Sequence, residues 1–123
     1  MSSASLTPLR DLVEVRDRLR EFADARDWDQ FHSPKNLAMA LIAEVAEVVE
    51  HFQWLTEAES ACLPPERKAE VAEELADVLA YLVRIADKLD VDLLAAVTAK
   101  IERNEERYPA DRARGSARKY NEL

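Results

Sequence analysis

Four acidic side chains interrupt two apolar stretches of this sequence. Glu44 and Glu47 are the only charged residues in segment 37–49, whose other members are Leu, Ile, Val, Met or Ala. Glu74 and Asp77 interrupt a second apolar stretch further along the chain. A helix that is apolar nearly all round is normally buried. A buried carboxylate is costly unless it is paired, protonated or bound to a cation, so these acids call for a partner.

The spacing of the acids places each pair on one helix face. Residues three apart lie about 60° apart around a helix axis, so Glu44 points the same way as Glu47, and Glu74 the same way as Asp77. If the two helices pack antiparallel, both pairs converge and repel one another. A hard divalent cation removes that repulsion. Oxygen ligands favour Mg²⁺, which shares its coordination with substrate phosphates, so we predict a magnesium site that docks a triphosphate.

A second interpretation of the acids stays open. Acidic pairs at this spacing are also common on solvated helix faces, where they bind nothing. Glu73 stands beside Glu74, so the choice of Glu74 depends on its spacing to Asp77. Under this interpretation the protein is a non-catalytic acidic helical interaction module, and it shows no response to Mg²⁺.

Long helices must position these acids. The sequence has a single glycine, whereas sheet proteins need glycine in their turns. Apolar spacing and start signals predict four helices joined by short segments, which indicates one all-α domain, residues 1–123, of the four-helix bundle type. We expect helices from Pro8 (capped by Thr7) to about 25, from Pro34 to about Trp54 or Leu55, from 65 to 88, and from Val91 (capped by Asp90) to 107, with a connection at 56–65 and a basic tail at 110–123.

Aromatic side chains flank the first acidic helix at both ends. Trp28, Phe31 and His32 precede it in a predicted loop, and Trp54 stands at its end. Aromatic faces stack on nucleic bases, which contributes about 1–3 kcal/mol per base. Tyr81 follows the second acidic pair by one turn, so its hydroxyl faces the same way. Alternatively, these rings are core or interface anchors.

The overall charge and the cysteine content exclude several classes of function. The net charge is −8, from 25 acids and 17 bases, which disfavours a nucleic-acid polymer as partner. The lone Cys62 cannot form an internal disulfide and fits a reducing cytosol. No secretory signal follows Met1, and no apolar run approaches the roughly 20 residues of a membrane span. We therefore expect a soluble cytoplasmic protein with no membrane partner.

Taken together, these features resemble the all-α nucleoside triphosphate pyrophosphatase superfamily, the MazG-like enzymes, and within it most closely the dCTP pyrophosphatase type. The likeness extends over nearly the whole chain. It depends on the acidic pairs and on the aromatic and tail segments around them, at residues 26–32, 44–54, 73–82, 107–110 and 116–120.

This resemblance implies Mg²⁺-dependent hydrolysis of a nucleoside triphosphate between its α and β phosphates, giving a monophosphate and pyrophosphate. It implies metal ligands at Glu44, Glu47, Glu74 and Asp77. It also implies nucleotide contacts at Trp28, Asp29, Gln30, Phe31, His32, Trp54, Tyr81, Lys100 and Asn104. One carboxylate of the cluster must orient or deprotonate the attacking water. Glu47 is our candidate for that base, although the sequence does not distinguish it from Glu44.

The resemblance further implies a homotetramer, a dimer of dimers with sites at its subunit interfaces. A small chain with very apolar helices is consistent with such an assembly. Leu19 stands at a position where the vertebrate enzymes carry a histidine of the base pocket. The preferred nucleotide therefore stays open between dCTP, a modified pyrimidine nucleotide and dUTP, in a role of nucleotide-pool housecleaning.

Overall fold

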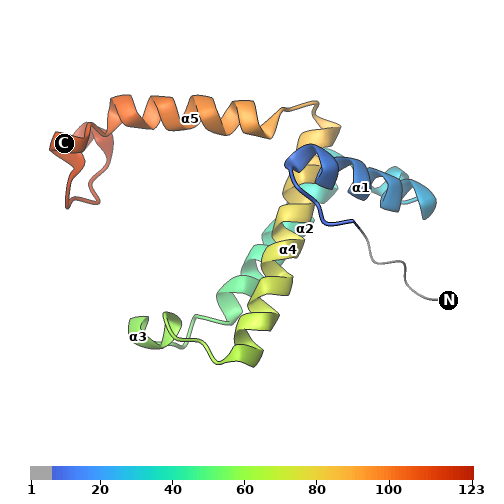
Figure 1. Cartoon of the computed structure of the whole chain (residues 1–123), viewed down its shortest axis with the longest axis horizontal. Helices are drawn as coiled ribbons and strands as arrows, with labels where there is room; N and C mark the ends of the chain where they lie inside the picture. The colour runs from blue at the N-terminus through green and yellow to red at the C-terminus, as the bar shows by residue number, and fades with distance from the viewer. Residues whose placement is uncertain (1–6) are drawn as a thin grey trace. The chain divides into compact units, whose positions relative to one another are not determined.

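The computed structural model describes residues 7–123, and every element in that range is helical, which confirms the all-α prediction. The chain forms two compact units, the first ending at Asp90 and the second beginning at Val91. The first unit contains α1 (Leu12–Ala25), the 3-10 turn η1 (Asp29–Phe31), α2 (Pro34–Glu50), the short α3 (Glu57–Ser60) and α4 (Pro65–Lys88). The second unit contains α5 (Leu93–Arg107), the short α6 (Ala110–Ala113) and the turn η2 (Tyr120–Glu122) (Figure 1).

Two helices begin at the residues that the sequence predicts, because local start signals define their first turns. Ser33 caps α2 because its hydroxyl accepts from the backbone N–H of Asn36 at 3.1 Å, and Pro34 occupies the first turn. The helix α4 spans the predicted residues 65–88. Just beyond its end, Asp90 adopts the left-handed conformation, at φ 54°, which stops the helix.

Two predicted helix starts are wrong by a few residues. Asp11, not Thr7, caps α1, since its carboxylate accepts from the N–H of Glu14 at 2.8 Å. Asp92, not Asp90, caps α5 by accepting from the N–H of Ala95 at 3.0 Å. In both places two residues able to cap lie close together in the sequence, and the actual caps, Asp11 and Asp92, have extended backbones.

The helix α2 also ends earlier than predicted, at Glu50. Beyond it the chain tightens into turns, and the N–H of His51 bonds to the carbonyl of Val48 instead of continuing the helical pattern. Within the predicted connection, Thr56 and Glu59 form a reciprocal capping box that starts α3.

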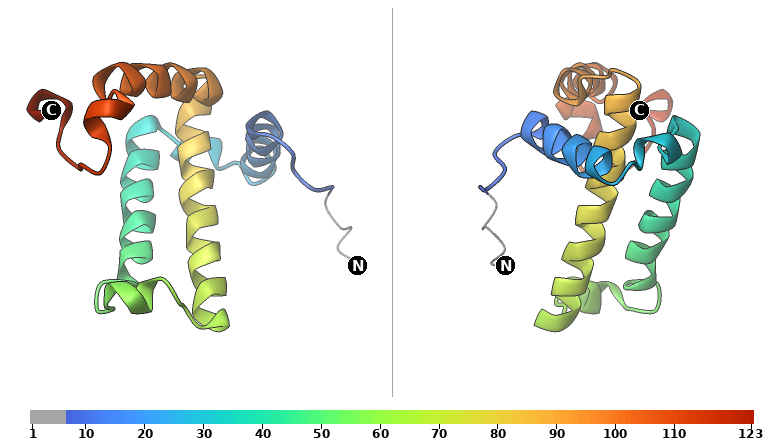
Figure 2. Two further views of the ribbon diagram at one scale, coloured as in Figure 1. Left: turned by 60° about the vertical axis from the view of Figure 1, so that its left-hand side comes forward. Right: turned by 90° about the vertical axis from the view of Figure 1, so that its right-hand side faces the viewer.

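The core of the first unit lies where α2 and α1 pack against α4. Both views of Figure 2 show α2 and α4 running side by side in opposite directions, which is the antiparallel pairing that the acidic pattern required. The buried apolar residues of the described chain all lie in this unit: Ala23, Leu37, Val71, Val83 and Ala86.

Large apolar side chains remain exposed on both helices of this pair. On α2, Met39, Ile42 and Val49 are 60%, 67% and 52% exposed, and they follow one helix face. On α4, Leu75 is 53% and Leu79 40% exposed. Despite these apolar faces, none of the helices within residues 7–123 is long and apolar enough to cross a membrane.

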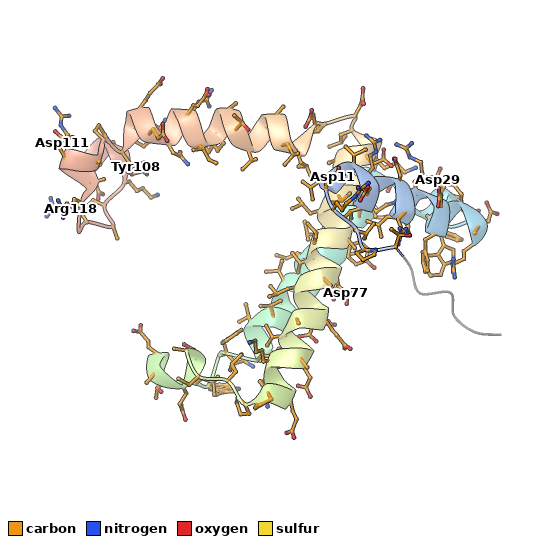
Figure 3. The ribbon with its side chains drawn as sticks, in the orientation of Figure 1. Asp11, Asp29, Asp77, Tyr108, Asp111 and Arg118 are labelled. Atoms are coloured by element: carbon orange, nitrogen blue, oxygen red, sulfur yellow. The ribbon has the colours of Figure 1, made fainter. Side chains whose placement is uncertain are left out.

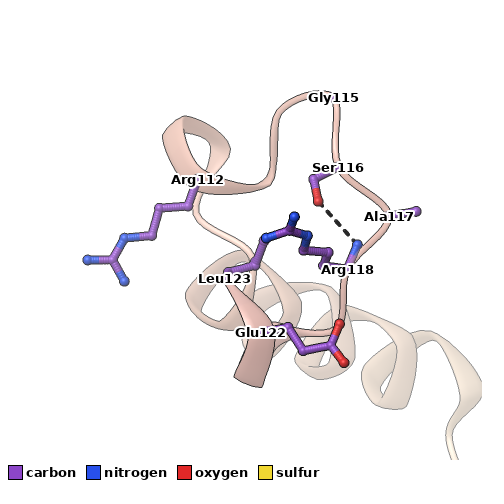
Figure 4. A pocket seen from close by; sticks show the side chains of 7 residues that line it. All are labelled: Arg112, Gly115, Ser116, Ala117, Arg118, Glu122 and Leu123. Atoms are coloured by element: carbon purple, nitrogen blue, oxygen red, sulfur yellow. Dashed lines mark hydrogen bonds between the residues drawn. The ribbon is translucent and has the colours of Figure 1, made fainter.

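The C-terminal tail folds back on the end of α5 within the second unit. The ring of Tyr120 lies edge-on to Tyr108, with centroids 6.3 Å apart, and the guanidinium of Arg107 stands 4.7 Å from the centre of the Tyr120 ring. The folded-back tail forms a shallow hollow, which is lined by Arg112 and by residues 115–118 and 122–123 (Figure 4). At this hollow the N–H of Arg118 donates to the Ser116 hydroxyl at 3.2 Å.

Candidate functional site

The four predicted acids lie on the antiparallel pair of α2 and α4. Oε2 of Glu44 is shielded from solvent and has no hydrogen-bond partner among the described residues. Burial raises the pKa of the Glu44 carboxyl, and the nearby charges of Glu47, then of Asp77 and Glu74, raise it further. The structure therefore brings the four carboxylates into one electrostatic neighbourhood. Figure 3 places Asp77 midway along α4.

The donor set of this region suits a hard divalent cation. Four carboxylates supply only oxygen ligands, which is the chemistry that Mg²⁺ prefers. A buried carboxylate oxygen without a partner, such as Oε2 of Glu44, is costly unless something else compensates its charge. In the range 7–123, however, no three acidic, histidine or cysteine side chains surround a common point. The residues thus fit a cation by chemistry and location, while their side chains do not form a closed cage.

A histidine that the sequence analysis did not assign lies against this cluster. His51 caps the end of α2, its side chain is only 14% exposed, and its Nε2 contacts Oε2 of Glu74. Its Nδ1 stands 3.4 Å from Nη1 of Arg67 and 3.8 Å from Oε2 of Glu70. One signal could have found it, because His51 follows Glu47 by four residues and so shares the acidic face of α2.

The aromatic loop before α2 is built around a compact turn. Asp27 adopts the left-handed conformation at φ 53°, which ends α1 and reverses the chain. The Trp28 ring then lies edge-on to Phe22, with centroids 5.5 Å apart, and to His32 at 6.4 Å. Phe31 is 61% exposed at the end of the turn η1. The side chain of Gln30 folds back and donates to the carbonyl of Asp27 at 2.9 Å.

A buried arginine of α4 ties this loop to the helix pair. Nη2 of Arg84 donates to Oδ1 of Asp29 at 3.3 Å and stands 3.1 Å from Nδ1 of His32, while Nη1 donates to Asp87 at 3.3 Å. Lys88 also pairs with Asp29. The hydrogen bond from Lys88, together with Arg84, lowers the pKa of Asp29. Burial first, and then the charges of Arg84 and Lys88, lower the pKa of His32.

No role for Arg84 was predicted from the sequence. The buried neighbours Val83 and Ala86 give α4 an apolar face here, so a charged residue inside that stretch was a possible signal. Its partners on the aromatic loop lie more than fifty residues away in the sequence, and only the fold reveals them.

The other predicted substrate contacts belong to several different elements of the chain. Trp54 is 87% exposed in the turn after α2, at the opposite end of that helix from the aromatic loop. Tyr81 is half-buried on α4, one turn after Asp77. In the second unit, α5 carries Lys100, which is exposed, and Asn104, which is half-buried.

Comparisons with known proteins agree on one family. The MazG-like family matches residues 40–123. The dCTP pyrophosphatase 1 of Homo sapiens is 48% identical over 121 residues, which cover 97% of this chain and 71% of that protein. The dCTP pyrophosphatase 1 of Rattus norvegicus is 46% identical over the same coverage. The crystal structure of a pyrophosphatase from Archaeoglobus fulgidus is similar with a TM-score of 0.76 and 42% identity, covering 86% of this chain and 99% of that one.

Proposed function

The chain belongs to the MazG-like family and is a nucleoside triphosphate pyrophosphohydrolase, and we propose that its substrate is dCTP or a modified pyrimidine deoxynucleotide. The reaction adds water to the α-phosphorus and breaks its bond to the bridging oxygen of the β-phosphate. The products are the monophosphate and pyrophosphate. Such an enzyme removes unwanted nucleotides from the cytoplasmic pool.

The observation that carries this proposal is the acidic cluster between α2 and α4. Glu44, Glu47, Glu74 and Asp77 would hold Mg²⁺, because a buried unpartnered oxygen and three further negative charges demand a compensating cation. Bound there, Mg²⁺ would supply charge neutralisation for the triphosphate and the departing pyrophosphate.

Two carboxylates of α2 then differ in what they are able to do. The Glu44 carboxylate is partly buried, and the charges of the other three acids raise its pKa, which suits a metal ligand. The Glu47 side chain is exposed, so a water molecule has access to its carboxylate. We therefore assign to Glu47 the orientation or deprotonation of the attacking water, in line with the expectation from the sequence.

The pyrimidine base and the phosphates of the proposed substrate are assigned contacts from different residues. The rings of Trp28, Phe31 and His32 lie in one loop and offer aromatic faces for a pyrimidine. For Tyr81 and Trp54 the proposed nucleotide contact comes from the family resemblance alone, since Trp54 lies at the opposite end of α2 from this loop. Asp29 and Gln30 hold the loop that presents them. On α5, Lys100 and Asn104 offer a charge and an amide for phosphate oxygens. This division follows the family resemblance residue by residue.

A homotetramer, arranged as a dimer of dimers, is the assembly that we propose. The apolar stripes of α2 and α4 lack a partner within the first unit. In the second unit, Leu94, Val97 and Ile101 form a similar stripe on α5, and they are 51%, 49% and 52% exposed. Exposed apolar faces of this extent mark sites of protein association.

The test is pyrophosphate release from a panel of canonical and modified nucleoside triphosphates, with Mg²⁺ and with EDTA. We expect metal-dependent release of equal amounts of pyrophosphate and monophosphate, fastest with a cytosine nucleotide. Release of inorganic phosphate instead would contradict cleavage between the α and β phosphates. Equal rates with EDTA and with Mg²⁺ would contradict the metal site. A fastest rate with dUTP or a purine nucleotide would overturn the assigned substrate alone.

A further inference from the structure

Arg84 is the only charged side chain that is buried in the described part of the chain, with 4% of its surface exposed. A buried cation is costly unless several hydrogen bonds hold it. Arg84 has partners on the aromatic loop and on its own helix, yet its Nε is shielded and has no hydrogen-bond partner within residues 7–123. An apolar residue would avoid that cost, so the position of Arg84 needs an explanation beyond packing.

The contact between Arg84 and His32 fixes the chemical form of the histidine. A guanidinium only donates hydrogen bonds, so Nδ1 of His32, 3.1 Å from Nη2 of Arg84, must accept. A ring whose Nδ1 accepts is neutral and carries its proton on Nε2. The lowered pKa of His32 agrees with this, since burial and the charges of Arg84 and Lys88 disfavour the imidazolium, opposed only by the carboxylate of Asp29.

The location of the loop indicates which part of a nucleotide this ring meets. Ten residues of α2 separate Pro34, beside the loop, from Glu44, which corresponds to about 15 Å along the helix axis. If a triphosphate held at the acidic cluster extends toward this end of α2, its base, and not its phosphates, reaches the loop. The Trp28 ring, edge-on to His32, supplies an aromatic surface at the same place.

We propose that Arg84 is a positioning residue of the base pocket, which holds His32 as the neutral Nε2–H tautomer so that the ring donates a hydrogen bond to a carbonyl oxygen of the pyrimidine. Nε2 forms no hydrogen bond among those found in residues 7–123, so its proton is available for a ligand. The proposal depends on the proposed function for the identity of the ligand, but the tautomer itself does not.

The tautomer is tested by NMR on the full-length protein, labelled with ¹⁵N-histidine and free of metal. The sequence has two histidines, and His32→Gln assigns the signals of His32. We expect a protonated Nε2, an unprotonated Nδ1 and a titration below the ordinary value of 6.5. In Arg84→Met the titration should move up and the tautomers should mix. A protonated Nδ1 in the native protein, or an unchanged spectrum in Arg84→Met, would overturn the proposal.

A matched control separates this effect from general loss of charge. Arg20 pairs with Asp87, which also contacts Arg84, but Arg20 does not contact His32. Arg20→Met should leave the His32 signals unchanged, and the same shift in both variants would contradict a specific role. If Arg84→Met fails to fold, Arg84→Lys keeps a positive charge without the forked geometry, and it should still disturb the tautomer.

Kinetics tests the role in the pocket. The loss of one oriented hydrogen bond should raise KM for dCTP about tenfold in Arg84→Met, with kcat within about twofold. For dATP, whose base has no carbonyl, KM should not change. A drop in kcat alone, or an equal rise in KM for both nucleotides, would overturn the base contact. If native protein hydrolyses no nucleotide, the proposed function fails while the NMR result still decides the tautomer.

Discussion

At the scale of single residues, the most informative atoms are buried side-chain nitrogens and oxygens that have no hydrogen-bond partner. Within the described chain they belong to Glu44 and Arg84, since the shielded Oε2 of Glu74 contacts Nε2 of His51. Glu44 lies in the acidic cluster, and Arg84 holds the aromatic loop. Natural proteins rarely keep such groups unless they serve a function, so these positions carry the chemical argument.

The first prediction concerns the ligands themselves. Glu47→Gln and Asp77→Asn should each reduce pyrophosphate release at least about 100-fold, because each removes a negative charge that would hold Mg²⁺, and Glu47→Gln also removes the proposed base. Circular dichroism should show an unchanged helical signal. Glu50→Gln, at the exposed end of the same helix, is the matched control and should retain activity. Full activity in either ligand variant would remove that residue from the site.

A second prediction follows from the raised pKa of Glu44. A carboxyl whose pKa is raised by folding destabilises the folded state at neutral pH, where it is forced to ionise. Glu44→Gln should therefore raise the melting temperature of the metal-free protein while abolishing any further rise on addition of Mg²⁺. Thermal unfolding with and without Mg²⁺ measures both effects. A lower melting temperature without metal would show that Glu44 ionises without strain.

At the scale of elements, local signals predicted more than tertiary ones. The bounds of α4 and the start of α2 were predictable because Pro and Ser act within one turn. The acidic face was predictable because the i,i+3 spacing needs only the helix geometry. The starts of α1 and α5 were not, since two residues able to cap stood close together in each case. The partners of Arg84 on the aromatic loop depend on tertiary contact, so the sequence did not reveal them, although a charged residue in an apolar stretch was a local signal.

The cap of α1 gives a third prediction. Asp11→Ala should destabilise the protein by about 1 kcal/mol, because the N–H of Glu14 loses its acceptor at the helix start. Thr7→Ala is the matched control and should have little effect, since the Thr7 side chain caps nothing in the structure. Chemical denaturation measures both. A larger effect for Thr7 than for Asp11 would restore the start predicted from the sequence.

The fourth prediction concerns acid stability where α1 meets α4. The hydrogen bond from Arg20, with the charges of Arg20 and Arg84, lowers the pKa of Asp87 below its ordinary value of 3.8. A lowered pKa contributes stability that is present above 3.8 and is lost as the pH falls through the folded-state value. Asp87→Asn should therefore lose less stability than the native protein on acidification below that pH. Identical acid profiles would show that Asp87 is not paired in solution.

At the scale of the whole molecule, few apolar residues are buried relative to the number that are exposed. In the described chain only Ala23, Leu37, Val71, Val83 and Ala86 are buried, whereas long side chains such as Ile42 and Leu75 remain half exposed or more. A core of this size contributes little to the free energy of folding of one chain. The helices of the first unit therefore need a further surface, and a second copy of this chain carries the same stripes.

The last prediction tests that need. Ile42 is 67% exposed in the centre of the α2 stripe, so Ile42→Lys places a charge where an interface would bury it. We expect sedimentation velocity to give a mass of four chains for the native protein and a smaller species for this variant. Glu106→Lys, an exposed charge reversal away from the α5 stripe, should leave the mass unchanged.

If the subunits complete one another's sites, Ile42→Lys should also lose pyrophosphate release, although it leaves every acidic ligand in place. A native protein that stays monomeric would require these helices to be stable alone, and loss of assembly with full activity would confine the site to one chain.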